Sequence, residues 1–396
     1  MTPLDEARRL VLEGVAALPA VRVAVTRAAG LVAAEAVVAA EAVPPFDNTA
    51  MDGYAVRAAD TPGRLRVAGF LPAGGTADVA VEPGAAVRIM TGAPMPPGAD
   101  AVVMVERTTT EGDEVAVEEV PVGEAVRRAG SDVQPGEVVV EPGTSLTPGH
   151  LGVLVSVGAV EVAVHRRPVV GVLSTGDELA GPGDALGPGQ IRDSNRPTLL
   201  ALVAENGFEA VDLGTVADEA GAVEAAIRDG VARCDAVLTS GGVSMGDLDH
   251  VKAVLNRIGD PARWLQVAIK PAKPLSHALV DGVPVIGLPG NPVSSMVSFE
   301  LFARPVLRRL AGHPDDRLVR PEVAGVAGEA LRRRPDGKTH FVRVAVAVEG
   351  GRLVARSAGG QGSHQLAAMA AADALAVLQD GDGVEAGAEV GLLLLR

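Results

Sequence analysis

The sequence contains very little cysteine and few aromatic residues. Cys234 is the single cysteine among 396 residues, which excludes an intramolecular disulfide and a cysteine-based zinc cluster and fits a reducing cytoplasm. Cys234 comes just before an apolar run, so we expect a buried structural thiol rather than a nucleophile. Because aromatic residues make up only 2% of the chain, its cores must be built from Val, Leu, Ile and Ala.

Long apolar runs and basic tracts are also absent. No stretch approaches the roughly 18 consecutive apolar residues of a membrane helix, and the N-terminus carries acidic residues at once, unlike a secretory signal. A formal net charge of −15 without a basic tract argues against nucleic acid as the main partner. We therefore expect a cytoplasmic protein that binds neither membranes nor nucleic acid. The histidines show no paired spacing, which makes a histidine zinc site improbable.

The chain is longer than one hydrophobic core usually supports, so two to four domains are expected. Apolar spacing predicts a helix over 4–17, and short β-like runs separated by Pro-Gly turns predict a β-rich module over 55–145. From residue 168, strands and amphipathic helices alternate, which is typical of a doubly wound parallel sheet. Beyond residue 321 the pattern is β-like again and predicts a small C-terminal barrel. The predicted α/β strands are 169–173, 211–216, 236–239 and 283–288, and the predicted helices are 194–205, with Ser194 as its cap, 219–233, 248–258 and about twenty residues after Pro292.

Three polar or glycine-rich loops follow strands of the predicted sheet. They span residues 174–178, 239–247 and 288–294. In open α/β sheets ligands bind beyond the carboxyl ends of the strands, so we expect these loops to converge on one crevice. Glycines let the backbone approach a ligand, and helix N-termini suit phosphate or other oxyanions. The three loops together favour a nucleotide or phosphate ligand over plain turns.

Three acidic residues, Glu178, Asp218 and Asp247, follow successive strands. Their carboxylates could meet and hold a hard divalent cation, and we expect Mg²⁺ bridging to phosphate oxygens. The alternative is that they are solvated or capping acids. For Asp247 the two interpretations have equal weight, since it could also cap the helix predicted from residue 248.

Two lysines, Lys270 and Lys273, alternate with small residues and prolines just after an apolar strand at 264–269. Isolated lysine pairs are usually only solvated. Here Pro271 and Pro274 stiffen the segment, and an acidic chain needs a local group of cations to bind any anion. This segment therefore predicts an oxyanion site.

Six segments that include these residues resemble the molybdopterin molybdenumtransferase family, which comprises the MoeA proteins and the gephyrin E-domain. The segments occur in family order and extend the similarity over essentially the whole chain. They are residues 45–55, 88–93, 174–179, 240–247, 270–274 and 287–294.

The resemblance implies a multidomain α/β plus β fold in an elongated homodimer. Four domains are expected. A discontinuous lever-like dimerisation domain would occupy 1–45 and 142–168, an inserted β-rich domain 46–141, a doubly wound molybdopterin-binding α/β domain 169–315 and a C-terminal β-barrel 316–396.

The resemblance also implies the reaction. The family inserts molybdenum from molybdate into adenylylated molybdopterin, in the presence of Mg²⁺, and yields molybdenum cofactor and AMP. The substrate donor would be a molybdopterin adenylyltransferase, and molybdoenzymes or cofactor carriers would accept the product.

Site roles follow from the matching positions. Asp52 and Thr91 match functional positions of the inserted domain, which in this family reaches the site of the other subunit. Asp218 and Asp247 resemble magnesium and catalytic acids, with Glu178 in the pterin-phosphate loop. The expected substrate or molybdate contacts are Lys270, Lys273, Ser294, Ser240, Gly241, Gly242, Pro289 and Pro292, with Arg343 and Ser363 from the last domain.

The chain departs from the family pattern at two places. Ala272 replaces a usual Gly, and residues 371–373 read Ala-Ala-Asp where Ala-Asn is usual. Three alternatives to molybdenum insertion are a non-catalytic molybdopterin-binding scaffold, tungstate-specific insertion and adenylylation of molybdopterin. Retention of both lysines and all three acids argues against the scaffold, and the extra terminal domains argue against adenylylation.

Overall fold

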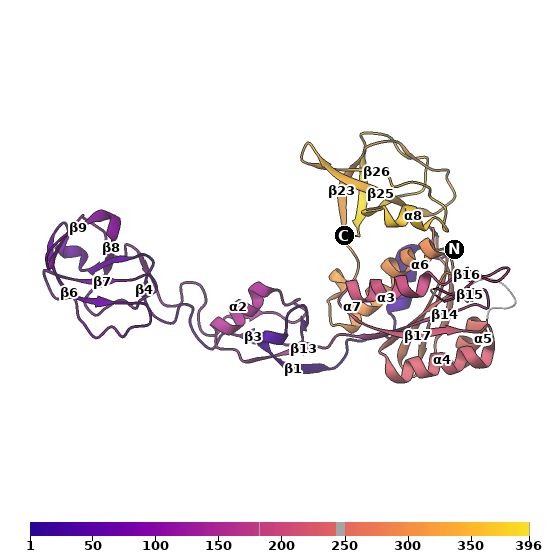
Figure 1. Cartoon of the computed structure of the whole chain (residues 1–396), viewed down its shortest axis with the longest axis horizontal. Coiled ribbons are helices and arrows are strands. Elements are labelled where there is room, and N and C mark those ends of the chain that lie inside the picture. Colours follow the sequence, from indigo (N-terminus) through magenta and orange to yellow (C-terminus); the bar gives the residue numbers. More distant parts are fainter. Residues whose placement is uncertain (182, 243–249, 396) are drawn as a thin grey trace. The chain divides into compact units, whose positions relative to one another are not determined.

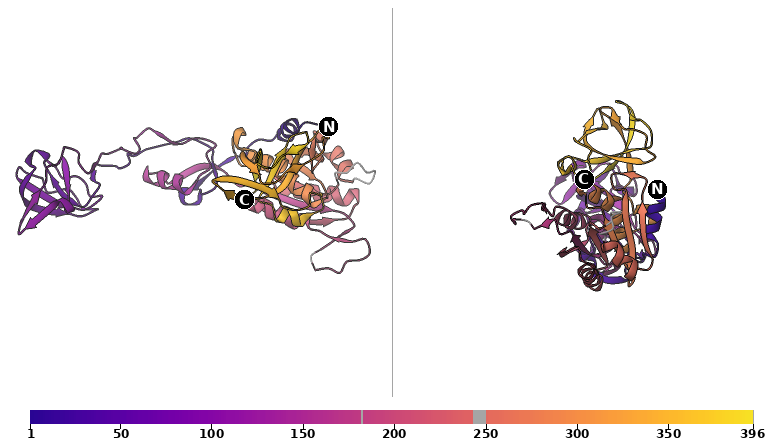
Figure 2. Two further views of the ribbon diagram at one scale, coloured as in Figure 1. Left: turned by 90° about the horizontal axis from the view of Figure 1, so that it is seen from above. Right: turned by 90° about the vertical axis from the view of Figure 1, so that its right-hand side faces the viewer.

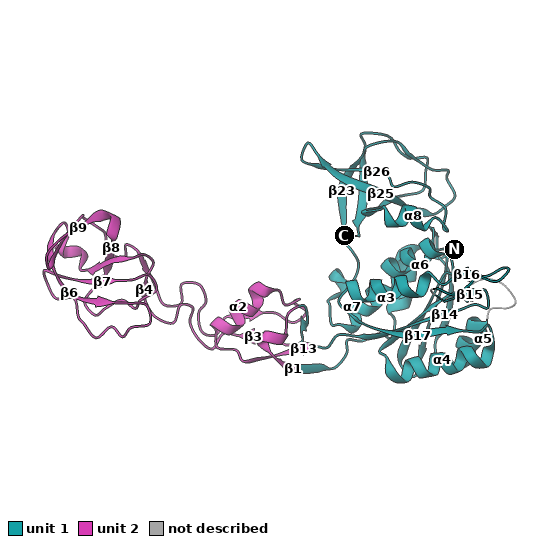
Figure 3. Cartoon of the chain, viewed as in Figure 1, with its two compact units in different colours: residues 1–21, 30–34, 165–396 teal, residues 22–29, 35–164 magenta. Residues whose placement is uncertain are grey.

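The computed structural model describes residues 1–181, 183–242 and 250–395 (Figure 1). The chain forms two compact units, which Figure 3 distinguishes by colour. Unit 1 contains residues 1–21, 30–34 and 165–396, and unit 2 contains residues 22–29 and 35–164. Three short strands lie where the chain passes between the units along the sequence: β1 (Ala20–Ala24), β2 (Val32–Ala33) and β13 (Glu161–His165).

Unit 2 is built around a six-stranded sheet with the order β8-β5-β7-β6-β10-β9. Its faces bury different residues, because successive side chains on a strand point to opposite sides: Tyr54 and Val56 lie in one core and Ala55 in the other. This sheet confirms the β-rich module predicted for 55–145. The strands are β5 (Gly53–Val56), β6 (Gly63–Leu71), β7 (Ala85–Ile89), β8 (Ala101–Met104), β9 (Thr108–Glu111) and β10 (Glu114–Val117).

The rest of unit 2 contains two short ribbons and a helix. β3 (Val37–Val38) pairs with β12 (Val138–Val140), and β4 (Asn48–Thr49) pairs with β11 (Val126–Arg127). Helix α2 spans Pro148–Ser156.

Unit 1 contains the predicted α/β domain. Its sheet has the order β17-β14-β18-β22-β21-β19, and the first four strands are parallel. The last two strands, β21 and β19, pair antiparallel with their neighbours, which the sequence interpretation did not anticipate. A two-residue turn at Asp281 and Gly282, both with positive φ, joins β21 to β22 as a tight hairpin. The strands are β14 (Val169–Thr175), β17 (Glu209–Val216), β18 (Ala236–Ser240), β19 (Ala262–Gln266), β21 (Pro274–Val280) and β22 (Val283–Leu288).

Helices cover both faces of this sheet, as the doubly wound prediction requires (Figure 1). In β14, Val170 and Val172 pack with the helices of one face, whereas Leu173 packs with those of the other. The first face carries α1 (Leu4–Leu12), α3 (Asn195–Glu205), α6 (Pro292–Ser298) and α7 (Arg304–Leu310), and the second carries α4 (Ala220–Arg233) and α5 (His250–Ile258).

Two details of these helices differ from the prediction. The helix predicted after Pro292 is continuous to Leu310, but Phe299–Ala303 within it is a π-helix. Ser194 does precede α3, yet its side chain makes no capping bond. Asp193 takes this role, because its Oδ1 accepts a hydrogen bond of 3.1 Å from the backbone N–H of Arg196.

The C-terminal residues form the predicted barrel. Five strands close in the order β25-β26-β23-β29-β27, with β27 pairing back to β25. Figures 1 and 2 show the barrel in yellow, stacked on the α/β domain near α6 and α8 (Leu366–Ala370). The barrel strands are β23 (Glu322–Ala327), β25 (Thr339–Glu349), β26 (Arg352–Ser357), β27 (Ala374–Leu378) and β29 (Glu389–Leu394).

Short strands complete unit 1. β15 (Leu179–Ala180) pairs with β16 (Ile191–Arg192), and β24 (Leu331–Arg332) pairs with β28 (Gly383–Val384). β20 (Ile269–Lys270) joins the barrel by pairing with β25. A backbone hydrogen bond of 3.1 Å from Val293 N–H to the Ser363 carbonyl also links α6 to the barrel. None of the described helices is long and apolar enough to cross a membrane.

Candidate functional site

The loops at the carboxyl ends of the parallel strands lie close together, as the sequence predicts. Gly241 N–H donates to the Leu288 carbonyl at 3.1 Å, and Asp218 N–H donates to Asp177 Oδ1 at 3.1 Å. Gly241 has a φ of +94°, and a Cβ there would lie 2.9 Å from the Thr175 carbonyl oxygen. Only glycine allows this approach. The loops after β14, β18 and β22 therefore form one continuous edge.

The remaining predicted residues of these loops occupy the same edge. Gly242 has a φ of +67°, Pro289 is buried and Pro292 is the first residue of α6. Proline suits this position, because its missing N–H would have no partner in the first helical turn.

A side chain that sequence reasoning missed connects two of the loops. Asn195, the first residue of α3, donates from Nδ2 to Ser240 Oγ at 2.8 Å and to the Gly290 carbonyl at 2.7 Å. Ser240 is 3% exposed, so its hydroxyl depends on such a partner. The only sequence signal was an amide side chain at the start of a predicted helix, beside the residue assigned as its cap.

The predicted metal ligands are only partly described. Glu178 and Asp218 are exposed side chains of the neighbouring loops after β14 and β17. Asp247 lies outside the described residues, so both of its interpretations stay open. Within the described ranges, no group of three or more His, Cys, Asp or Glu residues could hold a metal ion. The magnesium site therefore stays a prediction.

The predicted oxyanion residues line one cavity of about 560 Å³. Lys270 and Lys273 come from the loop that begins at β20, and Ser294 from the first turn of α6. Ser363 comes from the loop before α8. The cavity thus lies where the α/β domain meets the barrel, and its lining also includes Ala272, Lys338 and Gln361.

The lysines of this cavity differ in their ion pairing. Lys338 Nζ lies 2.8 Å from Asp336 Oδ2, whereas no carboxylate among the described residues pairs with Lys270 or Lys273. Two cations without a counter-ion on an acidic protein give the cavity a local positive potential. An oxyanion is the ligand that would balance it.

The backbone between the two lysines is strained. Ala272 has a φ of +76° and is 3% exposed. An alanine in the left-handed region costs about 1 kcal/mol relative to glycine. Ala272, which stands where the family usually has glycine, therefore keeps the left-handed backbone conformation that a glycine would adopt there.

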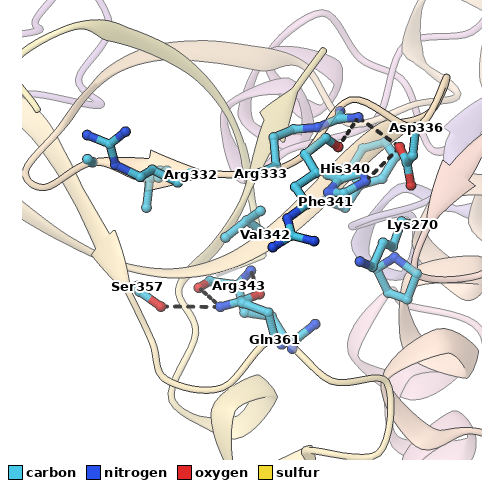
Figure 4. Close-up of a pocket in the computed structure, with 14 residues that line it drawn as sticks. Lys270, Arg332, Arg333, Asp336, His340, Phe341, Val342, Arg343, Ser357 and Gln361 are labelled. Atoms are coloured by element: carbon cyan, nitrogen blue, oxygen red, sulfur yellow. Dashed lines mark hydrogen bonds and ion pairs between the residues drawn. The ribbon is translucent and has the colours of Figure 1, made fainter. Parts of the chain in front are cut away.

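Arg343 lies beside this cavity rather than in its lining. It borders an adjoining cavity of about 530 Å³, which Lys270 and Gln361 also line (Figure 4). Its Nη2 donates to the carbonyls of Gly360 and Gly362 at 2.7 and 3.2 Å. The guanidinium therefore fixes the loop that leads to Ser363.

The Arg343 guanidinium is unusual because it is fully buried and, within the described part of the chain, forms no ion pair with a carboxylate. Its exposure is 0%, and among the described residues Nε and Nη1 have no hydrogen-bond partner. Burial lowers the pKa of Arg343 below its ordinary value. A buried cation with free donors favours an anion as its partner.

The adjoining cavity also contains a paired acidic residue. Asp336 Oδ1 lies 2.8 Å from Arg333 Nη2 and 3.1 Å from His340 Nε2. Hydrogen bonds from Lys338 and His340 hold the pKa of Asp336 at about 2. Asp336 therefore stays ionised and offsets part of the cavity's positive charge.

The two predicted residues of unit 2 form their own pair. Thr91 donates both its backbone N–H and its hydroxyl to Asp52 Oδ1, each at 2.7 Å. The hydrogen bond from the Thr91 backbone, followed by that from its side chain, lowers the pKa of Asp52. Asp52 is thus an oriented, ionised carboxylate at the surface of unit 2.

Three regions of the chain match parts of one protein family. Residues 2–158 match the MoeA N-terminal region (domain I and II). Residues 171–309 match a probable molybdopterin binding domain, and residues 326–395 match the MoeA C-terminal region (domain IV). Together these matches cover most of the chain.

Curated relatives and solved structures agree with these matches. The chain is 40% identical over 388 residues to Molybdopterin molybdenumtransferase 2 of Mycobacterium tuberculosis, covering 95% of each chain. It is 39% identical over 369 residues to the Haemophilus influenzae molybdopterin molybdenumtransferase, covering 92% of this chain and 91% of that one.

The fold match is equally extensive. The crystal structure of the molybdopterin biosynthesis MoeA protein from Pyrococcus horikoshii OT3 matches with a TM-score of 0.84 and 28% identity, covering 100% of both chains. A second crystal structure, of the molybdopterin biosynthesis MoeA protein from Pyrococcus horikosii, matches at a TM-score of 0.81 and 30% identity, covering 100% of this chain and 99% of that one. The predicted family and fold class are confirmed, and the chain belongs to the MoeA family of molybdopterin molybdenumtransferases.

Proposed function

We propose that this chain inserts molybdenum from molybdate into adenylylated molybdopterin and releases AMP. As a member of its family, the chain is a molybdopterin molybdenumtransferase of molybdenum cofactor biosynthesis. The observation that carries the detailed reaction is the cavity where Lys270 and Lys273 converge with Ser294 and Ser363. It offers cations and hydroxyl groups to an oxyanion, and it adjoins the buried Arg343.

Within this proposal, molybdate is the substrate of the lysine cavity. The lysines offset charge on the oxyanion and on the phosphoanhydride while the adenylate leaves, a preorganised electrostatic role worth several kcal/mol. Arg343 keeps the loop before Ser363 in place and supplies the remaining positive charge. No protein nucleophile is required.

The substrate phosphates would bind along the edge formed by Ser240, Gly241, Gly242 and the loop at Pro289 and Pro292. The close packing of these loops supports this placement, because successive backbone N–H groups and a helix start suit phosphate. Glu178, Asp218 and Asp247 would hold Mg²⁺. A site with one or two carboxylates is sufficient, since Mg²⁺ usually takes its other ligands from water and phosphate. When bound, the ion would neutralise phosphate charge.

Asp52 and Thr91 would act at the site of the other subunit of a homodimer. Their preformed hydrogen bonds support a role for Asp52 as an ionised, oriented carboxylate. We also propose four domains, which occupy residues 1–45 with 142–168, 46–141, 169–315 and 316–396. The donor would be a molybdopterin adenylyltransferase, the acceptors molybdoenzymes or cofactor carriers, and the location the cytoplasm.

Purified protein incubated with adenylylated molybdopterin tests the reaction. AMP release should require Mg²⁺ and rise with micromolar molybdate. Parallel reactions with tungstate test oxyanion preference, and chelation of Mg²⁺ is the control. If tungstate stimulated AMP release as strongly as molybdate does, the site would not be specific for molybdate. Substrate binding without AMP release under any oxyanion would favour the non-catalytic scaffold.

A further inference from the structure

The side chain of Asn195 bridges the ends of β18 and β22, in addition to the backbone hydrogen bond from Gly241 to Leu288. Its Nδ2 donates to Ser240 Oγ at 2.8 Å and to the Gly290 carbonyl at 2.7 Å. One side chain thus joins Ser240 and Gly290, which are 45 and 95 residues further along the chain.

The orientation of this amide follows from its partners. A backbone carbonyl only accepts hydrogen bonds, so the atom facing Gly290 must be the nitrogen of Asn195. Both hydrogens of Nδ2 are then engaged. The Ser240 hydroxyl becomes an acceptor from Asn195, which leaves its own hydrogen free to donate. Among the described residues, none donates to Asn195 Oδ1.

The base of this arrangement is rigid. Asp193, whose side chain is 1% exposed, accepts from Arg196 N–H and Nε at 3.1 Å and from Thr215 Oγ1 at 3.3 Å. Asp193 therefore holds the start of α3 against β17. Asn195, two residues later, begins the helix at a fixed position beside the loops.

We propose that Asn195 is a positioning residue for the phosphate groups of the substrate. It reinforces the backbone link between the two loops and makes the Ser240 hydroxyl a hydrogen-bond donor to a phosphate oxygen. Its own Oδ1 offers an acceptor for an N–H or O–H group of the same ligand. This inference rests on the proposed function, because adenylylated molybdopterin supplies the phosphates.

Two substitutions separate these roles. Asn195→Ala removes the contact to both loops, and affinity for AMP and for adenylylated molybdopterin should fall roughly three- to tenfold, the effect of one or two hydrogen bonds. Asn195→Asp keeps the shape but places an acceptor against the Gly290 carbonyl. It also turns the Ser240 hydroxyl toward the new carboxylate, so affinity should fall further.

A double-mutant cycle distinguishes positioning from general destabilisation. If Asn195 acts through Ser240, the affinity of Asn195→Ala/Ser240→Ala should be close to that of the weaker single variant, because the second change removes nothing more. Affinities come from calorimetric titration with AMP and with the full substrate. The turnover assay should show a larger change in KM than in kcat.

Thr198→Val is the matched control. Thr198 Oγ1 donates to the Ser194 carbonyl at 2.8 Å in the same helix, but it touches neither loop. This variant should keep wild-type affinity. Independent losses in the double variant, or wild-type affinity in Asn195→Asp, would overturn the inference. A wild-type protein that binds AMP but releases none from the substrate would instead refute the proposed function, and the affinity cycle would still decide the role of Asn195.

Discussion

The charged site residues of the two units differ in whether they already have hydrogen-bond or ion-pair partners. In unit 1, Lys270 and Lys273 have no acidic partner among the described residues, and the buried Arg343 has two free nitrogens. In unit 2, two hydrogen bonds from Thr91 already occupy Oδ1 of the Asp52 carboxylate. The cations of unit 1 are therefore arranged to bind an anionic ligand. In unit 2, the orientation of the Asp52 carboxylate is already fixed before any ligand binds.

This difference lies in pairing rather than in burial. Lys270 and Lys273 are exposed side chains that line the cavity, and each cation without a counter-ion there raises the benefit of binding an anion. Asp52 is half-buried, and Thr91 already holds its Oδ1, so a binding partner adds less. Substitutions in unit 1 should therefore act mainly by removing positive charge. Substitutions in unit 2 should act mainly by changing the orientation of Asp52.

The largest expected effect is loss of the lysine charge in unit 1. Lys270→Ala should reduce molybdate-dependent AMP release about 10²–10³-fold, since removing one preorganised electrostatic contact costs this much. The melting temperature should be unchanged, because the side chain pairs with no described carboxylate. Lys338→Ala is the matched control in the same cavity and should lose less activity, since Asp336 already neutralises Lys338. Equal losses in the two variants would contradict the distinction between free and paired cations.

The next effect concerns the pH dependence of stability in unit 1. Burial lowers the pKa of His277 to about 4, aided by the nearby Arg263. In the unfolded chain, His277 takes up a proton below its ordinary pKa of 6.5, whereas in the folded chain it does so only near pH 4. The contribution of His277 to stability is therefore complete above pH 6.5 and is lost as the pH drops toward 4. Between pH 7.5 and 5.5 this histidine should cost about 1.4 kcal/mol of unfolding free energy.

His277→Leu measures this contribution. Both ring nitrogens are buried without a described partner, so leucine should not destabilise the protein at pH 7.5. Urea unfolding at the two pH values should show a smaller loss in the variant. The pKa of His313 is also about 4, mainly through burial, and this residue should preserve part of the slope. An identical pH dependence in wild type and variant would contradict the assignment.

The smallest effect lies in unit 2. Thr91→Val removes the hydroxyl donor but keeps the backbone N–H, so the pKa of Asp52 should rise part of the way toward its ordinary value. NMR titration of the carboxylate would detect the shift. Thr110→Val, which removes the 3.0 Å contact with the Tyr54 hydroxyl in the same sheet, should leave the pKa of Asp52 unchanged. A shift of similar size in both variants would mean that Asp52 responds to the sheet as a whole.

Much of the α/β domain was predictable because its strands and helices have local signals. Buried runs such as the one at β18 and the Gly-rich loops after them marked the strand ends correctly. The grouping of Lys270 and Lys273 with Ser294 came from the family resemblance. The antiparallel edge did not follow, because the Asp281-Gly282 turn was not interpreted as a hairpin.

Contacts distant in sequence could not be predicted from the residues alone. The approach of Ser363 to the start of α6 depends on how the barrel docks. The bond from Asn195 to Gly290 spans 95 residues. The same holds for Arg343, whose burial beside rather than within the lysine cavity is set by the loop at Gly360 and Gly362. The π-helical turn at Phe299–Ala303 likewise has no signal in the apolar pattern.

The scarcity of aromatic residues gives each unit its own chromophore. The single tryptophan, Trp264, lies on β19 of unit 1, with its indole N–H donating to Asn256 at 2.8 Å. The single tyrosine, Tyr54, lies on β5 of unit 2, where it is 6% exposed. Selective excitation of the indole should therefore follow unit 1 alone, while the NMR resonances of the phenol ring follow unit 2. The unmodified chain can thus report the unfolding of its two halves as separate spectroscopic signals.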